Sequence, residues 1–115
     1  MADCIFCRIA SGEVPAKIAK RSADMVAFHD LTPQAPVHVL VIPTKHFGAV
    51  REARGPEAEA VLGRLLGFAA EVATELGLDA RGYRLVTNTG PDGGQSVFHL
   101  HLHLLGGRPL GWPPG

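Results

Sequence analysis

The 115-residue sequence has little of what marks several classes of protein. Its two cysteines, Cys4 and Cys7, are too few and too close together for the disulfide framework of a secreted domain. Eleven basic side chains balance eleven acidic ones without a basic run, which excludes the charge pattern of a nucleic-acid polymer binder. A single nucleotide remains possible as a ligand.

Long apolar segments are also missing. No stretch approaches the ~20 apolar residues of a membrane-spanning helix, and the first residues, MADCIFCRIA, do not follow the pattern of a signal peptide. We therefore expect a cytoplasmic protein with no membrane partner. At this length the chain fits one domain, residues 1–115, in which residues 107–115 form an irregular C-terminal tail.

What the sequence does contain is a regular pattern of histidines. The segment SVFHLHLHLLGG places His99, His101 and His103 at alternate positions. Side chains two residues apart share one face of a strand, about 6.6 Å from each other, whereas on a helix they fan apart, so the spacing predicts a strand. We expect the histidines on one accessible face. The other face is expected to bury the apolar residues Val97, Leu100, Leu102 and Leu104.

Turn residues and hydrophobic periodicity divide the rest of the chain into an α+β order. We predict a short helix over residues 4–12, a long helix over 56–76, and strands over 16–22, 25–31, 37–43 and 83–88. Strands joined by short turns favour an antiparallel sheet, and the long helix must cover one of its faces. Gly63 and Gly67 in this helix indicate close packing, either by the domain's own sheet or by a partner subunit.

The loop NTGPDGGQS leads directly into the histidines. Gly93 and Gly94 lack Cβ atoms, so their backbone N–H groups can approach an anion, and Ser96 adds a hydroxyl. Together with the imidazoles, which suit attack on phosphorus and proton transfer, the loop predicts a phosphate site. A metal site is the competing interpretation, although rings about 13 Å apart, as the first and third would be on a strand, do not easily share one ion.

The segment HLHLHLL matches the signature of the histidine triad (HIT) superfamily of nucleotide hydrolases and transferases. The similarity also covers CIFCRIASGEVPAKI, AFHDLTPQAPVHVLVIPTKH, GYRLVTNTG and GGQSVFHLHLHLLGGRPLGWPPG. The chain most resembles the histidine triad nucleotide-binding branch, whose members hydrolyse purine nucleoside phosphoramidates. This resemblance implies a five-stranded antiparallel sheet, and a homodimer that joins two such sheets into one.

The resemblance also implies roles for individual residues. His101 is expected to be the nucleophile that takes the nucleoside monophosphate, His103 to contact the phosphate, and His99 to support the site, with His38 behind it. Ser96 is expected to hydrogen-bond the leaving group. The remaining contacts of the purine nucleotide are expected from Asp30 at the ribose, from Phe6, Ile9, Phe28 and Leu31 at the base, and from Asn88, Gly94 and Gln95 at the phosphate. No organic cofactor is implied.

Residue chemistry alone leaves other interpretations of some of these positions. The apolar side chains could simply be core, and Asp30 could cap the turn toward Pro33. Cys4 and Cys7 could be a redox pair, half of a zinc site or two small packing residues. The resemblance to prokaryotic-type triad proteins implies a structural zinc held by Cys4, Cys7, His46 and His99, without a part in the chemistry.

Three functions follow: a phosphoramidate hydrolase, a dinucleoside polyphosphate hydrolase or nucleotidyltransferase of the same superfamily, and a nucleotide-binding regulatory module. His101 argues against a site without turnover. The sequence LLGGR stands where the dinucleoside hydrolases typically have a proline-arginine motif, which argues against the second function. In the tail, Trp112 is expected to dock on a surface, which the resemblance places across the dimer near the neighbour's active site.

Overall fold

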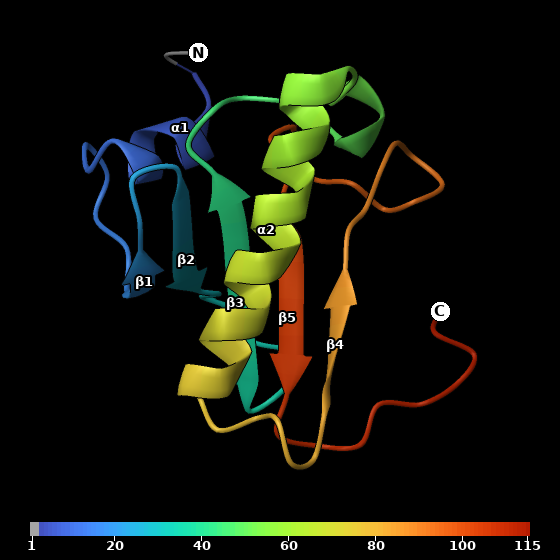
Figure 1. Ribbon diagram of the computed structural model, residues 1–115. Coiled ribbons are helices and arrows are strands. Elements are labelled where there is room, and N and C mark those ends of the chain that lie inside the picture. Colours follow the sequence, from blue (N-terminus) through green and yellow to red (C-terminus); the bar gives the residue numbers. More distant parts are fainter. Residues whose placement is uncertain (1–2) are drawn as a thin grey trace.

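The computed structural model describes residues 3–115, which form one antiparallel five-stranded sheet in the order β1-β2-β3-β5-β4 (Figure 1). The α+β prediction is confirmed. The elements in chain order are α1 (Ile5–Ala10), β1 (Ile18–Arg21), β2 (Met25–His29), β3 (Val37–Pro43), a short 3-10 helix (Val50–Glu52), α2 (Pro56–Glu75), β4 (Tyr83–Val86) and β5 (Leu102–Gly106).

The long helix α2 covers one face of the sheet (Figure 1). It begins with Pro56, whose fixed φ suits the first turn, and it ends before Gly77, whose φ of 76° is open to glycine. Its apolar stripe consists of Leu65, Phe68, Ala69 and Val72 and packs on β2, β3 and β5. The larger core cluster contains this stripe and, from the sheet side, Met25, Ala27, Val39, Val41, Leu100, Leu102 and Leu104. Within residues 3–115, no helix combines the length and apolarity needed to cross a membrane.

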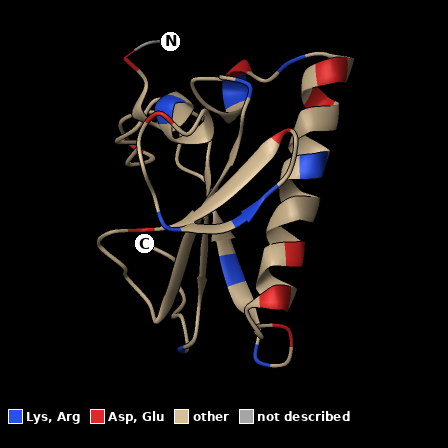
Figure 2. Ribbon diagram, turned by 90° about the vertical axis from the view of Figure 1, so that its left-hand side faces the viewer, with Lys and Arg blue, Asp and Glu red and all other residues tan. Residues whose placement is uncertain are grey.

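The short helix α1 lies on the opposite side of the sheet from α2 (Figure 2). Cys4 caps its N-terminus, where the thiol accepts a hydrogen bond from the N–H of Cys7 at 3.4 Å. A helix of this length is not stable in isolation, so packing must hold it. Phe6 and Ile9 supply that packing in a second core cluster with Val26, Phe28, Leu40 and Ile42.

The prediction for the histidine segment is right about the alternation and wrong about the exposure. Leu100, Leu102 and Leu104 pack under α2, but His99 is fully buried and His101 is only 5% exposed. The cause is Phe6 of α1, whose ring centroid lies 5.9 Å from that of His99 and 5.2 Å from that of His101. Two of the three histidines that we expected to be accessible, His99 and His101, therefore lie beneath α1, whereas His103 is half-buried.

The strand is also shorter than expected. β5 begins at Leu102, because the N–H of Leu100 donates to the carbonyl of Phe47 instead of joining the ladder. The chain bends over residues 97–99, and Val97 packs on the α1 side against the cluster that contains Phe6 and Ile9. Placing Val97 with the leucines was wrong, because Val97 is two residues before His99 and alternation itself puts it on the histidine side.

Two surface features concern possible partners. A Cβ atom built on Gly63 or Gly67 meets nothing within 4 Å, so these glycines do not pack against the domain's own sheet.

Residues 107–115 contain neither helix nor strand, and Arg84 on β4 holds them by donating to the carbonyls of Leu110 and Gly111 at 3.2 and 2.7 Å. Trp112 is 83% exposed, so it does not dock on its own protomer.

Candidate active site and metal centre

Hydrogen bonding fixes the protonation of the His101 ring. Its Nδ1 atom lies 2.7 Å from the carbonyl oxygen of His99, and because a carbonyl only accepts, Nδ1 must carry the hydrogen. The hydroxyl of Thr87 donates to the carbonyl of His101 at 2.9 Å and secures the backbone. Burial lowers the pKa of His101, which favours the neutral ring. His101 is thus a neutral imidazole whose Nε2 lone pair is unprotonated, as a nucleophile requires.

A second chain of hydrogen bonds orients His103. The N–H of Gln34 donates to Nδ1 of His38 at 3.0 Å, so the hydrogen of neutral His38 resides on Nε2. That Nε2 lies 2.9 Å from Nδ1 of His103, which accepts and leaves the His103 hydrogen on its own Nε2. Burial, together with the nearby His101 and His38 rings, lowers the pKa of His103 to about 4. His103 is therefore a neutral hydrogen-bond donor 5.1 Å, ring to ring, from His101.

Asp30 performs the turn-capping role that was one of its two interpretations. Its Oδ1 accepts from the N–H of Thr32 at 2.7 Å, and its Oδ2 lies 3.5 Å from Nε2 of His38. A carboxylate has about four acceptor positions, so these contacts leave room for ribose hydroxyls. The capping role and the expected ribose role are compatible.

The residues expected at the base line one cavity of about 330 Å³ between α1 and the end of β2. Its lining includes Phe6, Ile9, Phe28, Asp30, Leu31 and Val97. Leu31 is 97% exposed and stands at the rim, whereas Phe6 also contacts the His101 ring. Cavities of this size and apolar character commonly bind small ligands.

The glycine loop uses some of the donors that were expected for phosphate. The N–H groups of Gly94 and Gln95 donate to carbonyls of the same turn, each at 3.1 Å. Gly93 is required sterically, since a Cβ there would lie 2.4 Å from the carbonyl oxygen of Thr89. Ser96 is exposed next to this turn, so its hydroxyl is accessible to a ligand.

Two side-chain amides stabilise the same loop. Asn88 donates from Nδ2 to the carbonyl of Gly93 at 2.6 Å. Gln95 accepts from the N–H of Gly90 at 3.0 Å and donates to the carbonyl of Gly48 at 2.7 Å. In this structure, Asn88 and Gln95 hold the shape of the turn that leads to the histidines.

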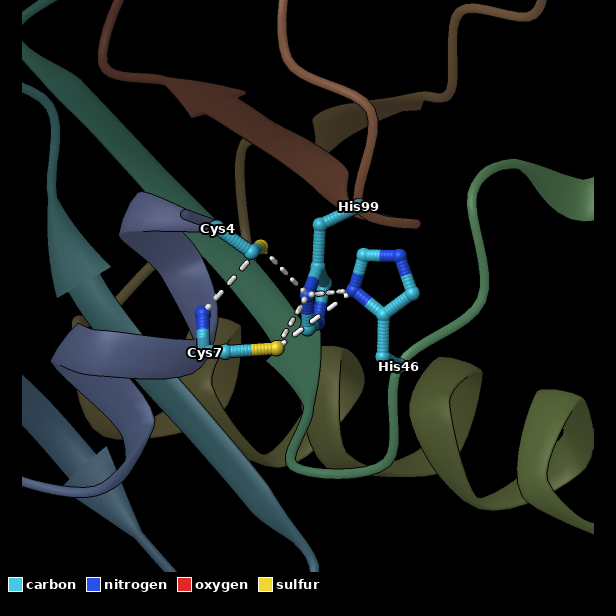
Figure 3. A group of neighbouring side chains, drawn as sticks. All are labelled: Cys4, Cys7, His46 and His99. Carbon is cyan, nitrogen blue, oxygen red and sulfur yellow. Dashed lines mark hydrogen bonds between the residues drawn. The ribbon is translucent and has the colours of Figure 1, made fainter. Parts of the chain in front are cut away.

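The four residues expected to bind zinc converge at the N-terminus of α1 (Figure 3). The Sγ atoms of Cys4 and Cys7 lie 3.3 and 3.5 Å from Nδ1 of His99. Nδ1 of His46 lies 3.4 Å from the Cys7 sulfur and 3.2 Å from Nδ1 of His99. Tetrahedral zinc with its usual bond lengths places nitrogens about 3.3 Å apart and a sulfur about 3.6 Å from a nitrogen, so the donors fit this ion.

The second nitrogen of His99 supports the same conclusion. Nε2 lies 2.9 Å from the carbonyl oxygen of Pro43 and must donate to it, which leaves the Nδ1 lone pair directed at the sulfurs. A second group of Asp30, His38 and His103 also lies within metal-binding distances. Because Nε2 of His38 carries its hydrogen there, that group does not offer the lone pair that a metal needs.

Sequence reasoning missed three groups that organise the site. Thr87 holds the backbone of His101, whereas Gln34 and Pro43 orient histidines through a backbone N–H and a carbonyl. Backbone groups leave no mark in the residue pattern. Only Thr87, a polar residue at the end of a predicted strand, carried any signal.

Three alternating histidines at the start of the interior strand β5, next to an apolar cavity, define a histidine triad protein. The HIT domain family matches residues 11–110, and the chain belongs to this family. The "14 kDa zinc-binding protein" of Brassica juncea is 46% identical over 98% of this chain and all of its own length. The "Adenylylsulfatase HINT1" of Arabidopsis thaliana is 46% identical over 96% of this chain and 76% of its own.

Solved structures agree with this assignment. The crystal structure of a HIT family hydrolase from Legionella pneumophila matches with a TM-score of 0.94 and 45% identity. The match covers 98% of this chain and all of that one. The fold of the whole described chain is thus the HIT fold.

Proposed function

We propose that this protein is a nucleotide-binding hydrolase that cleaves the P–N bond of purine nucleoside phosphoramidates through a nucleotidyl-histidine intermediate on His101. The observation that carries the proposal is the hydrogen bond from His101 Nδ1 to the carbonyl of His99, because it leaves Nε2 free to attack. Membership of the HIT domain family and the hydrolase names of relatives support the same class of reaction.

The reaction has two steps. Nε2 of His101 attacks phosphorus as the P–N bond breaks, and the departing nitrogen takes a proton from solvent through the Ser96 hydroxyl and leaves as the amine. Water then attacks phosphorus and gives up a proton to solvent as the bond to Nε2 breaks, which releases the nucleoside monophosphate and restores the neutral His101 ring. The neutral His103 ring donates from Nε2 to a phosphate oxygen in both steps and so stabilises the negative charge of the transition state. Its Nδ1 already accepts from His38, so His103 does not take up the proton that the leaving amine needs.

Binding uses the surrounding residues. Asp30 accepts hydrogen bonds from the ribose hydroxyls, while Phe6, Ile9, Phe28 and Leu31 enclose the purine. Asn88, Gly94 and Gln95 form the phosphate side of the site through the shape of their turn. His99 and His38 act behind the reacting centre by orienting His101 and His103.

The metal centre is proposed to hold a structural zinc. Cys4, Cys7, His46 and His99 are its ligands, and the ion supplies positive charge that keeps both thiols deprotonated when bound. All four protein ligands are needed for this geometry, so the centre leaves no position for a substrate. Reduced thiols suit the cytoplasm, where we place the protein.

We also propose a homodimer. β4 is an edge strand with half-buried residues, and the tail with the exposed Trp112 runs beside it (Figure 1). Pairing of two β4 edges would join the sheets of two protomers and remove an unpaired edge. The uncovered Gly63 and Gly67 on α2 are compatible with a second chain.

A substrate panel tests the proposed reaction. Adenosine and guanosine phosphoramidates, diadenosine polyphosphates and adenylyl sulfate are compared by kcat/KM. We expect the phosphoramidates to be turned over most efficiently, with adenylyl sulfate as the second candidate because a relative carries the name adenylylsulfatase. Preference for the diadenosine compounds, or binding without turnover of any, would replace the proposal by one of the other two functions.

A further inference from the structure

Helix α1 lines the cavity that is proposed to hold the purine base. Ile5, Phe6 and Ile9 all face this cavity of about 330 Å³. Phe6 packs edge to face on Phe28, with ring centroids 5.4 Å apart, and contacts the His101 ring on its other side. The position of α1 therefore decides the shape of the base site.

The same helix has little stability of its own. It has six residues, below the length at which helices form alone, so its position depends on the packing of Phe6 and Ile9 against the sheet and on the polar links at its two ends. At its C-terminal end the attachment is a hydrogen bond from the exposed Arg21 to the carbonyl of Ala10 at 2.8 Å. At its N-terminal end the attachment is the pair of metal ligands Cys4 and Cys7.

These ligands bracket the aromatic residue of the base site. Phe6 lies between Cys4 and Cys7 in the sequence, within a single turn. The opposite ligands belong to the sheet side: His46 follows β3, and His99 precedes β5 and is bonded to the Pro43 carbonyl on β3. Ligation thus connects the turn carrying Phe6 to the centre of the sheet (Figure 3).

We propose that metal ligation by Cys4 and Cys7 controls recognition of the base, because it clamps α1 against the sheet as one side of the base site. The proposal rests on the proposed nucleotide function. Cys4 and Cys7 are positioning residues that act through Phe6 and Ile9. Without metal, the base loses contacts with α1, while the phosphate and ribose keep His101, His103 and Asp30, which the sheet and its hydrogen bonds hold.

The test compares two ligands that differ by the base. Dissociation constants of AMP and of ribose 5-phosphate are measured on zinc-loaded protein, on chelator-treated protein, and after zinc is added back. The same measurements are made on Cys7→Ala and on the control Arg8→Ala, which removes a side chain of the same helix that, among residues 3–115, bonds only to Glu13. Hydrogen exchange of the α1 amides reports the position of the helix independently of any ligand.

We expect metal removal and Cys7→Ala each to weaken AMP binding at least tenfold and ribose 5-phosphate binding less than twofold. The α1 amides should then exchange faster, and zinc should restore wild-type protein but not Cys7→Ala. Arg8→Ala should resemble wild type. Equal weakening of both ligands, or unchanged AMP binding in metal-free protein, would overturn the proposal.

Failure of the proposed function gives a different result. If zinc-loaded protein binds neither AMP nor ribose 5-phosphate, the nucleotide function is wrong and base recognition falls with it. Zinc-dependent exchange of the α1 amides would in that case still show that the metal holds the helix. If the protein takes up no zinc, the clamp itself is contradicted.

Discussion

Nε2 of His38 on β3 lies 2.9 Å from Nδ1 of His103 on β5, and this contact determines which nitrogen of His103 carries the hydrogen. The N–H of Gln34 donates to Nδ1 of His38, and Nε2 of His38 donates to Nδ1 of His103. The hydrogen of His103 is therefore on its Nε2. The arrangement requires that both rings stay neutral. Protonation of His103 would place a second donor against the N–H of His38 and break the chain.

Stability should therefore fall in acid. The pKa of His103 is about 4 in the folded protein against 6.5 for an unperturbed histidine, so the unfolded chain takes up the proton first as the pH falls. The contribution of this ring is complete above pH 6.5 and is lost between about 6.5 and 4. Urea unfolding of metal-free protein across this window checks it. His103→Asn should show a shallower pH dependence, and an equal slope in the two proteins would contradict the assignment.

Substitution of Asp30 should separate its two roles. Asp30→Asn keeps an oxygen for the N–H of Thr32, whereas Asp30→Ala removes both the cap and the ribose acceptor. We expect both variants to lose discrimination between AMP and 2′,3′-dideoxy-AMP, a loss of about 1 to 3 kcal/mol in relative binding. Only Asp30→Ala should also be less stable. If Asp30→Asn prefers the ribonucleotide as strongly as wild type does, the ribose role is wrong.

Metal analysis should find about one zinc per chain in protein purified without a histidine tag. Cys4→Ser should release it and destabilise the fold by about 3 to 4 kcal/mol, the linkage expected where free zinc exceeds its Kd by 100- to 1000-fold. kcat should change little, because the four-ligand centre is closed to substrate. Metal-free wild-type protein with undiminished stability would leave the two cysteines as packing residues.

The tail should influence the leaving group rather than the nucleophile. Deletion of residues 111–115 removes the exposed Trp112 but leaves His101 and its hydrogen bonds in place. We expect a changed preference among amine leaving groups, and a change of Trp112 fluorescence when nucleotide binds the intact protein. Arg84→Ala, which removes the hydrogen bonds to Leu110 and Gly111 without shortening the tail, should show part of the same effect. Identical preferences together with unresponsive fluorescence would contradict a role at the site.

Much of the fold could be predicted from the sequence because local patterns determine it. The alternating and β-branched stretches place β3 at residues 37–43 as observed, and Pro56 and Gly77 bracket α2 within one residue. The other strands are shorter than predicted at their ends. Strand ends depend on whether a partner strand continues the ladder, which no local pattern records.

The candidate site shows where such prediction stops. The convergence of Cys4, Cys7, His46 and His99 was expected from a resemblance, and no spacing in the sequence specifies it. The burial of His101 under Phe6 depends on where α1 docks, which is a tertiary property. The sequence predicts that backbone N–H groups of this loop bind phosphate, but those of Gly94 and Gln95 donate to the carbonyls of Pro91 and Gly90. Backbone groups of a tight turn pair with one another, and no residue pattern records which of them do so.

The central claim is that Nε2 of His101 becomes covalently bonded to phosphorus during turnover. Wild-type protein is mixed with an adenosine phosphoramidate, quenched within a turnover, kept at alkaline pH to preserve a phosphorus–nitrogen bond, and digested for mass spectrometry. We expect an adenylyl group on His101, and in His101→Asn no adduct and no turnover, with AMP affinity within about tenfold of wild type. Turnover by purified His101→Asn at a near-normal rate, or an adduct on another residue, would contradict the account.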